Sequence, residues 1–176
     1  MVTLSLLRHA KSSWDKPLDD YERPLSRRGE KAAPEMGSVI IELDCRPDLI
    51  LCSGAKRARE TLGLVLDKIG APAPQVRYDD ALYMATPDTI ISRVKAATTN
   101  GADTAPKHVM VVGHNPGLEE LALQLVGSGA EDERARLAQK FPTAGLAVIS
   151  FDEGTWQGIG PGAGRLDHFV APRRLP

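Results

Sequence analysis

The sequence has 176 residues, of which 42% are hydrophobic and 26% are charged, and its formal net charge is −1. This length suits one α/β domain spanning residues 1–176, and the composition is ordinary for a globular protein. The near-neutral charge gives no general electrostatic reason to bind nucleic acid or an anionic membrane, and no apolar run is long enough to span a bilayer. We therefore expect neither nucleic acid nor membrane as a partner.

The chain shows no sign of export or of a metal site. Its first residues lack the basic segment that opens a signal peptide. Cys45 and Cys52 do not have the spacing of a zinc-binding pair, so we expect free thiols in a reducing compartment. These features favour a cytoplasmic protein without cofactor or metal.

The first half of the chain alternates between expected strands and helices. An apolar strand at 2–7 precedes a polar loop, and Ser26 is placed to cap a helix that runs to about Leu43. A buried strand at 48–53 is followed by a helix at 55–69, which Gly70 would end. A weak strand at 75–78 comes next. Thr86-Pro87 then has the pattern of a capped helix start.

The second half continues the alternation. The run at 108–113 predicts a strand buried on both faces, as in a parallel sheet, and Pro116 opens a helix to Leu125. A charged segment at 131–140 is compatible with another helix. Strands are expected at 146–151 and 165–170, antiparallel to each other at a sheet edge. The whole pattern predicts a three-layer αβα sandwich with a mostly parallel central sheet.

Polar residues come directly after the ends of three of these strands. Arg8-His9 comes after the first strand, Ser53 and Arg57 after the second, and His114-Asn115 after the strand at 108–113. In an open α/β sheet, ligands bind beyond the carboxyl ends of parallel strands. If these strands are neighbours, two histidines and two arginines meet in one cationic site that suits a phosphate dianion.

Phosphoryl transfer explains why these residue types would be needed together. Charge spreads over the equatorial oxygens in the transition state, and arginine forks can grip those oxygens in pairs. A neutral imidazole is a good nucleophile, and its phosphoramidate product can be hydrolysed in a second step. Two histidines without a carboxylate or cysteine cluster favour this covalent route over a metal-dependent one.

The motifs resemble those of the histidine phosphatase superfamily, which has the phosphoglycerate-mutase-like fold, and most closely its SixA-type phosphohistidine phosphatases. The opening motif spans residues 7–14 and reads Leu-Arg-His-Ala-Lys-Ser-Ser-Trp. Similar to later family motifs are Ser53-x-x-x-Arg57-Ala58-x-x-Thr61, Gly113-His114-Asn115-Pro116, the segment 141–144 and the ending 169–173. The resemblance implies that the chain is a metal-independent phosphatase with this fold.

The resemblance also implies roles for the site residues. His9 would be the phosphorylated nucleophile, and Arg8, Arg57 and His114 would form the phosphate pocket, with Lys11 and Asn115 as further candidates. Lys11 either touches phosphate or is solvated, and the sequence leaves both open. The nearby cations Arg8 and Arg57 should lower the pKa of His9 by repelling its protonated form.

Other charged residues have plainer interpretations. Arg59 is a rival to Arg57, but residues two apart on a helix face different ways, and the spacing from Ser53 favours Arg57. His108 and His168 lie inside strand-like runs without a partner motif and are expected to be structural. Arg23 is expected to pair with Asp19 or Asp20 and to shape the loop before it.

The family's usual general acid is not evident. Mutases and phosphomonoesterases of the family carry a Glu or Asp after the third strand, where this chain offers only Asp79 and Asp80, neither in a convincing position. An imidazole leaving group depends less on such an acid than an alkoxide does. This favours hydrolysis of phosphohistidine on a protein, such as a histidine-containing phosphotransfer domain.

Two alternatives stay open. One is a phosphomonoesterase or mutase that acts on a small phosphorylated metabolite, although so short a chain has few loops from which to build a lid. The other is a non-catalytic phosphate-binding module, against which the presence of both histidines and both arginine motifs argues.

Overall fold

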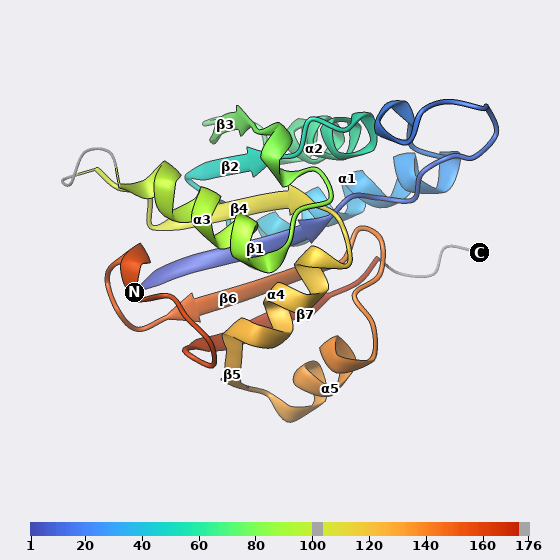
Figure 1. The fold of residues 1–176 in the computed structure, drawn as a ribbon. Helices are drawn as coiled ribbons and strands as arrows, with labels where there is room; N and C mark the ends of the chain where they lie inside the picture. The colour runs from blue at the N-terminus through green and yellow to red at the C-terminus, as the bar shows by residue number, and fades with distance from the viewer. Residues whose placement is uncertain (100–103, 173–176) are drawn as a thin grey trace.

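The computed structural model describes residues 1–99 and 104–172, so Arg173 of the expected C-terminal motif lies outside the described residues. In chain order the strands and α-helices are β1 (Val2–Arg8), α1 (Arg27–Glu42), β2 (Leu49–Cys52), α2 (Lys56–Ile69), β3 (Gln75–Tyr78), α3 (Pro87–Thr98), β4 (His108–Gly113), α4 (Gly117–Leu125), β5 (Val126–Gly129), α5 (Glu131–Gln139), β6 (Leu146–Phe151) and β7 (Gly164–Val170). Three short 3₁₀ turns accompany them: η1 (Asp20–Glu22), η2 (Asp80–Leu82) and η3 (Trp156–Gly158). Figure 1 shows the arrangement of these elements.

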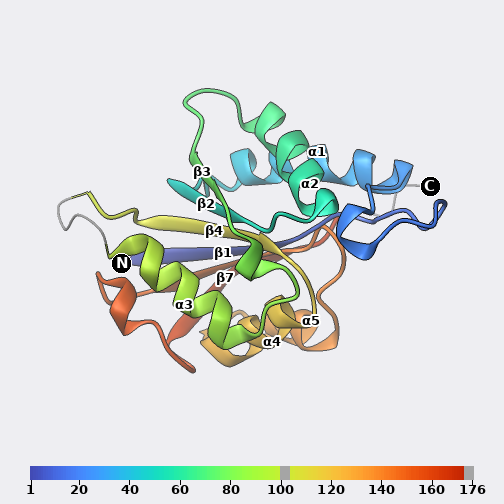
Figure 2. The same ribbon diagram turned by 45° about the horizontal axis from the view of Figure 1, so that its top comes forward.

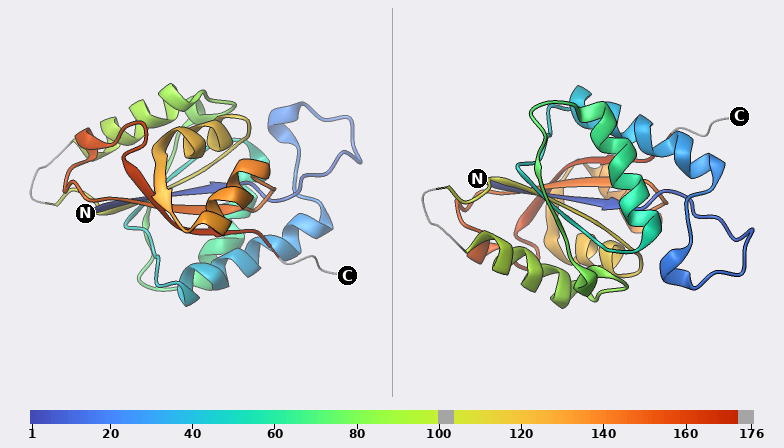
Figure 3. Two further views of the ribbon diagram at one scale, coloured as in Figure 1. Left: turned by 90° about the horizontal axis from the view of Figure 1, so that it is seen from below. Right: turned by 90° about the horizontal axis from the view of Figure 1, so that it is seen from above.

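The strands form one seven-stranded sheet in the order β3-β2-β4-β1-β6-β7-β5. Strands β3, β2, β4 and β1 are parallel neighbours, whereas β6 runs antiparallel to both β1 and β7. Helices α1 and α2 cover one face of the sheet and α3 and α4 the other, as the edge-on views of Figure 3 show. The predicted three-layer α/β fold with a mostly parallel sheet is thereby confirmed.

One strand was not predicted, and it changes the edge of the sheet. Strands β6 and β7 do pair antiparallel to each other, but they do not form the edge, because β5 adds to β7 in parallel. The sequence of β5 is Val-Gly-Ser-Gly, which has one apolar side chain and two glycines. Such a segment carries no alternation of apolar and polar residues, and glycine is disfavoured in strands.

Both faces of the central strands are buried, which explains their continuous apolar sequences. In β4, Val109 and Val111 belong to the core under α3 and α4, whereas Met110 and Val112 belong to the core under α1 and α2. This alternation follows from the two-residue period of a strand. Within the described residues, no helix is long and apolar enough to cross a membrane.

The two predicted N-caps, Ser26 and Thr86, are confirmed. The hydroxyl of Ser26 accepts a hydrogen bond from Gly29 N at 3.2 Å, and that of Thr86 accepts one from Thr89 N at 3.3 Å. These bonds satisfy backbone donors that lack a partner in the first helical turn. Gly70 ends α2 at a φ of 69°, a conformation that favours glycine.

Helices α1 and α2 approach each other closely at Gly37. A Cβ atom at this position would lie 2.7 Å from Lys68 Cβ and 2.9 Å from the carbonyl oxygen of Val65. Close packing therefore requires glycine at this position. Figure 2 shows α1 and α2 side by side. Gly63 on α2 differs, because a Cβ atom there would meet nothing within 4 Å.

We predict opposite effects of alanine at these two helical glycines. Gly37→Ala should lower the free energy of unfolding by about 1–3 kcal/mol, since overpacking outweighs the gain in helix propensity. Gly63→Ala should raise it by about 0.5–1 kcal/mol. Urea unfolding of both variants measures this. If Gly37→Ala were as stable as Gly63→Ala, the helices would not be held at this separation.

Candidate active site

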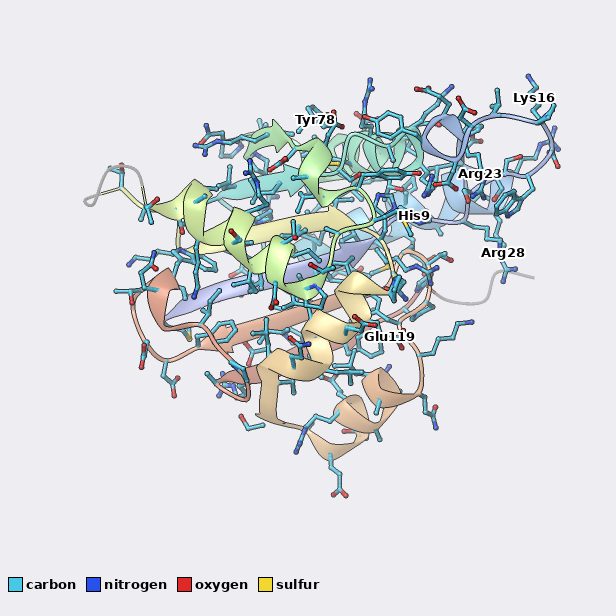
Figure 4. The ribbon with its side chains drawn as sticks, viewed as in Figure 1. His9, Lys16, Arg23, Arg28, Tyr78 and Glu119 are labelled. Atoms are coloured by element: carbon cyan, nitrogen blue, oxygen red, sulfur yellow. The ribbon has the colours of Figure 1, made fainter. Side chains whose placement is uncertain are left out.

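The three polar strand ends lie together, beyond the carboxyl ends of the strands, because β1, β4 and β2 are parallel neighbours. His9 N donates to Gly113 O at 3.1 Å, and Ser53 N donates to Val112 O at 3.0 Å. The backbone therefore carries His9, Ser53 and His114 to the same side. Figure 4 shows His9 at this end of β1, with Lys16, Arg23 and Arg28 on the segments that extend beyond it.

The imidazole of His9 is held in one tautomer. Its Nδ1 lies 2.7 Å from the carbonyl oxygen of Ala10, which can only accept, so Nδ1 carries the proton and Nε2 has a lone pair. Arg57 Nε donates to that Nε2 at 3.3 Å. Thr61 on α2 accepts from Ala10 N at 2.9 Å and so fixes the peptide that orients the ring.

Burial keeps both site histidines neutral. The pKa of His9 is lowered from 6.5 to about 4, chiefly by burial and in smaller part by the positive charges of Arg57, Arg8 and Arg23. The expected direction is correct, but desolvation outweighs the arginine charges that we expected to cause it. The pKa of His114 is lowered to about 3, again chiefly by burial and then by His9 and Arg57.

His114 faces His9 across the site. The centroids of the two rings lie 5.2 Å apart, and His114 Nε2 lies 2.8 Å from the hydroxyl of Ser53. That hydroxyl also accepts from Ala55 N at 3.3 Å, so its own proton is available to the imidazole. His114 Nδ1 is buried without a hydrogen-bond partner among the described residues.

Arg8 and Asn115 are fixed by a shared acceptor. Arg8 Nη1 and Asn115 Nδ2 donate to the carbonyl oxygen of Phe141 at 3.0 and 2.9 Å. Arg8 Nε and Asn115 Oδ1 are buried without a partner in the described part of the chain. A buried polar atom without a partner costs free energy, so these atoms and His114 Nδ1 favour a polar ligand.

The structure separates Arg57 from Arg59. Arg57 is 4% exposed and contacts His9. Arg59 is exposed, lies 5.9 Å from the centroid of the Tyr78 ring, and helps to line a neighbouring groove of about 390 Å³ with Gly54 and Lys56. The two arginines therefore face different sides of α2, as their spacing predicts.

Sequence reasoning missed that Asp20 reaches the site. Its carboxylate accepts from Arg57 Nη2 at 2.9 Å and from Arg23 Nη1 at 3.0 Å, and its backbone oxygen accepts from Arg57 Nη1 at 2.6 Å. The hydroxyl of Tyr83 also donates to the carboxylate. This bond, followed by those from Arg57 and Arg23, lowers the pKa of Asp20 to about 2. The pairing of Arg23 with Asp20 was expected, but the contact with Arg57 has no sequence signal.

The remaining candidates lie elsewhere or at the rim. Asp79 accepts from Arg93 Nε at 2.5 Å, and Asp80 accepts from the Tyr21 hydroxyl at 2.6 Å. Lys11 has an exposed side chain, so its role stays a prediction.

The other histidines also lie apart from the site, and both cysteines belong to the core under α1 and α2. His108 begins β4, at the opposite end from His114, and its Nε2 lies 2.6 Å from the Ser5 hydroxyl. His168 belongs to β7. Cys45 and Cys52 are buried free thiols, as expected.

The chain is similar to a known family and to known proteins. A family model described as histidine phosphatase superfamily (branch 1) matches residues 4–83. An uncharacterized protein of Mycobacterium leprae is 37% identical, over 95% of this chain and 100% of its own length. A protein of Agrobacterium tumefaciens described as the "putative phosphohistidine phosphatase SixA" is 34% identical with a TM-score of 0.78, over 97% of this chain and 98% of its own.

A third similarity concerns the fold alone. The protein histidine phosphatase SixA complexed with tungstate has a TM-score of 0.74 at 21% identity, over 99% of this chain and 100% of that chain. The family model ends before His114, so the second histidine is placed by the geometry of β4 and not by that match.

The lowered pKa values of three histidines predict that acid destabilises the fold. His9, His108 and His114 have folded pKa values of about 4, 4 and 3, below the usual 6.5, so the unfolded chain binds protons first. Above pH 6.5 the three histidines are neutral in both states and do not lower the free energy of unfolding. As the pH falls towards 4, protonation stabilises the unfolded chain, and the free energy of unfolding decreases. The free energy of unfolding should therefore drop between pH 7 and pH 5, by up to about 2 kcal/mol for each histidine.

Urea unfolding at both pH values measures this loss. The variant His108→Gln, which leaves the two site histidines in place, should show a smaller drop than the wild type. Equal stability at pH 7 and pH 5 would mean that the folded chain protonates these histidines as readily as the unfolded chain does.

Proposed function

The chain belongs to the histidine phosphatase superfamily, branch 1, and from this premise we propose that it is a metal-independent phosphatase with His9 as its nucleophile. The observation that carries the proposal is the state of His9. Its Nδ1–H is bound by the Ala10 carbonyl, and its Nε2 presents a lone pair next to Arg57 in a buried site. A neutral imidazole among fixed cations is suited to attack a phosphoryl group.

The proposed reaction has two steps. In the first, His9 Nε2 forms a bond to phosphorus while the bond from phosphorus to the leaving group breaks, which gives a phosphoramidate. In the second, water attacks phosphorus, the bond from phosphorus to His9 Nε2 breaks, and phosphate is released. The bonding electrons return to Nε2 and Nδ1 keeps its proton, so neutral His9 is restored. The protons of the attacking water stay on the released phosphate, which gives up any excess proton to solvent.

Three groups would stabilise the charge on the phosphoryl oxygens. Arg8 and Arg57 supply N–H donors and positive charge. Ser53 can donate its hydroxyl proton to His114 Nε2, which leaves His114 Nδ1 protonated and able to donate to a phosphoryl oxygen. Asn115 and Lys11 are secondary candidates for contact with the phosphate or with the group that carries it.

We propose phosphohistidine on a protein as the substrate. The carboxylates considered as general acids are engaged elsewhere, Asp79 with Arg93 and Asp80 with Tyr21. Asp20 is ionised at neutral pH, since its pKa is about 2. A site in which none of these three carboxylates is free to donate a proton favours an imidazole leaving group over an alkoxide. The similarity to the Agrobacterium SixA, at 34% identity, supports the same substrate class.

We predict hydrolysis of a phosphohistidine protein in the presence of EDTA, because a histidine nucleophile and arginine donors need no metal. The assay compares that substrate with a panel of small phosphomonoesters, in the wild type and in His9→Ala. The wild type should prefer phosphohistidine, and rapid quenching should trap acid-labile phosphate on His9. His9→Ala should be inactive. His114→Ala should be slowed roughly a hundredfold, the usual effect of removing one charge-stabilising donor.

The outcomes separate the alternatives. Preference for a small phosphoester would identify a metabolite phosphatase or mutase. Binding without turnover would identify a phosphate-binding module. Loss of activity in EDTA, restored by a divalent ion, or near-normal turnover by His9→Ala would each rule out the proposed mechanism.

We predict that Arg57→Ala lowers kcat/KM far more than Arg59→Ala, because only Arg57 contacts His9. The expected loss for Arg57→Ala is about a hundredfold or more, whereas Arg59→Ala should stay within about threefold of the wild type. Steady-state kinetics on the preferred substrate measure both variants. Similar losses would show that α2 does not present Arg57 alone to the phosphoryl group.

A further inference from the structure

The guanidinium group of Arg57 donates hydrogen bonds both to the proposed nucleophile, His9, and to Asp20. Its Nε donates to His9, its Nη1 donates to the backbone oxygen of Asp20, and its Nη2 donates to the carboxylate of Asp20. Both terminal nitrogens, which form the fork that binds a phosphoryl group in pairs, thus meet Asp20. The same geometry directs the Nε proton at the lone pair that would attack phosphorus.

The Asp20 carboxylate also accepts hydrogen bonds from two other side chains, Tyr83 and Arg23. Tyr83 donates its hydroxyl to the carboxylate, and Arg23 Nη1 donates to Oδ1 at 3.0 Å. Arg23 is itself buried and fixed, since its Nε donates to Ser13 O and its Nη2 donates to the Ser12 hydroxyl. Asp20 therefore has a second cation that stays in place if its bonds to Arg57 are broken.

We propose that Asp20 competes with the phosphoryl group for Arg57, so that substrate binding exchanges the Asp20 carboxylate for phosphoryl oxygens. This inference rests on the proposed function, because it assigns the phosphoryl group to Arg57. Asp20 swings out towards water with Arg23 as its partner. The Arg57 fork turns to the phosphate, and His9 Nε2 is released to attack phosphorus.

Burial and charge favour this direction of exchange. The side chain of Asp20 is 45% exposed and lies on the short turn η1, so it can be rehydrated at low cost. The side chain of Arg57 is 5% exposed and needs an anionic partner in any state of the site. A phosphoryl dianion gains more than a single carboxylate does from Arg57 together with Arg8.

The charged groups around the exchange are of both signs. Arg8, Arg23 and Arg57 are the cations that act on His9. Asp20 contacts Arg23 and Arg57, and the charge of Glu119 acts on Arg8. Asp19, the neighbouring residue, caps η1 without a side-chain hydrogen bond and has an exposed side chain. Removal of its charge therefore provides a matched control on the same turn.

The test measures binding of inorganic phosphate by calorimetry at pH 8, without turnover. Asp20→Asn keeps the shape of the side chain but removes the competing charge, so it should bind phosphate about three- to tenfold more tightly than the wild type. Asp19→Asn should bind within about twofold of the wild type. Tyr83→Phe, which removes one donor that holds Asp20, should also tighten binding, though by less.

Each result decides the inference. Phosphate binding by Asp20→Asn that equals or falls below that of the wild type would overturn it and would make Asp20 a positioning residue for Arg57. If Asp20→Asn does not fold, Tyr83→Phe decides in the same way. Wild-type binding that Arg57→Ala leaves unchanged would overturn the proposed phosphate pocket as well, whereas failure of Asp20→Asn alone leaves the proposed function standing.

Discussion

The contact between Arg57 Nε and His9 Nε2 is the constraint on which the rest of the site depends. It exists only while His9 is neutral, because a protonated imidazole would offer a second positive donor in place of a lone pair. Burial lowers the pKa of His9 to about 4, and the Ala10 carbonyl holds the single proton on Nδ1. The positive charge of Arg57 in turn needs the anion that Asp20 supplies.

Much of the fold could be predicted because the central strands are buried on both faces. Their continuous apolar runs, as at 108–113, mark strands of a parallel sheet, and the cap residues Ser26 and Thr86 mark helix starts. The strand β5 could not be predicted, since Gly127 and Gly129 give it no apolar pattern. It joins the sheet only because β7 offers an open edge, which is a property of the assembled fold.

The same distinction separates the site residues that could be predicted from the one that could not. His9, Arg57 and His114 could be predicted because each follows a strand closely, and the backbone then dictates where it lies. Asp20 could not, because it comes from a long loop with no periodic pattern and reaches Arg57 across 37 residues of sequence. The main cause of the lowered pKa of His9 could not be predicted for a related reason. Charges can be counted in a sequence, whereas the degree of burial follows from three-dimensional packing.

The strand order also determines when each pair of strands can form while the chain is being synthesised. β1 carries the nucleophile at its end and is made first, yet its two neighbours in the sheet are β4 and β6, which end at residues 113 and 151. A growing chain therefore holds His9 long before it can form the strand pairs that shelter it. Pairing across so many residues is slow, because the loop must close before any contact forms. Until β6 leaves the ribosome, the apolar residues of β1 lack one of their permanent neighbours and depend on other protection from aggregation.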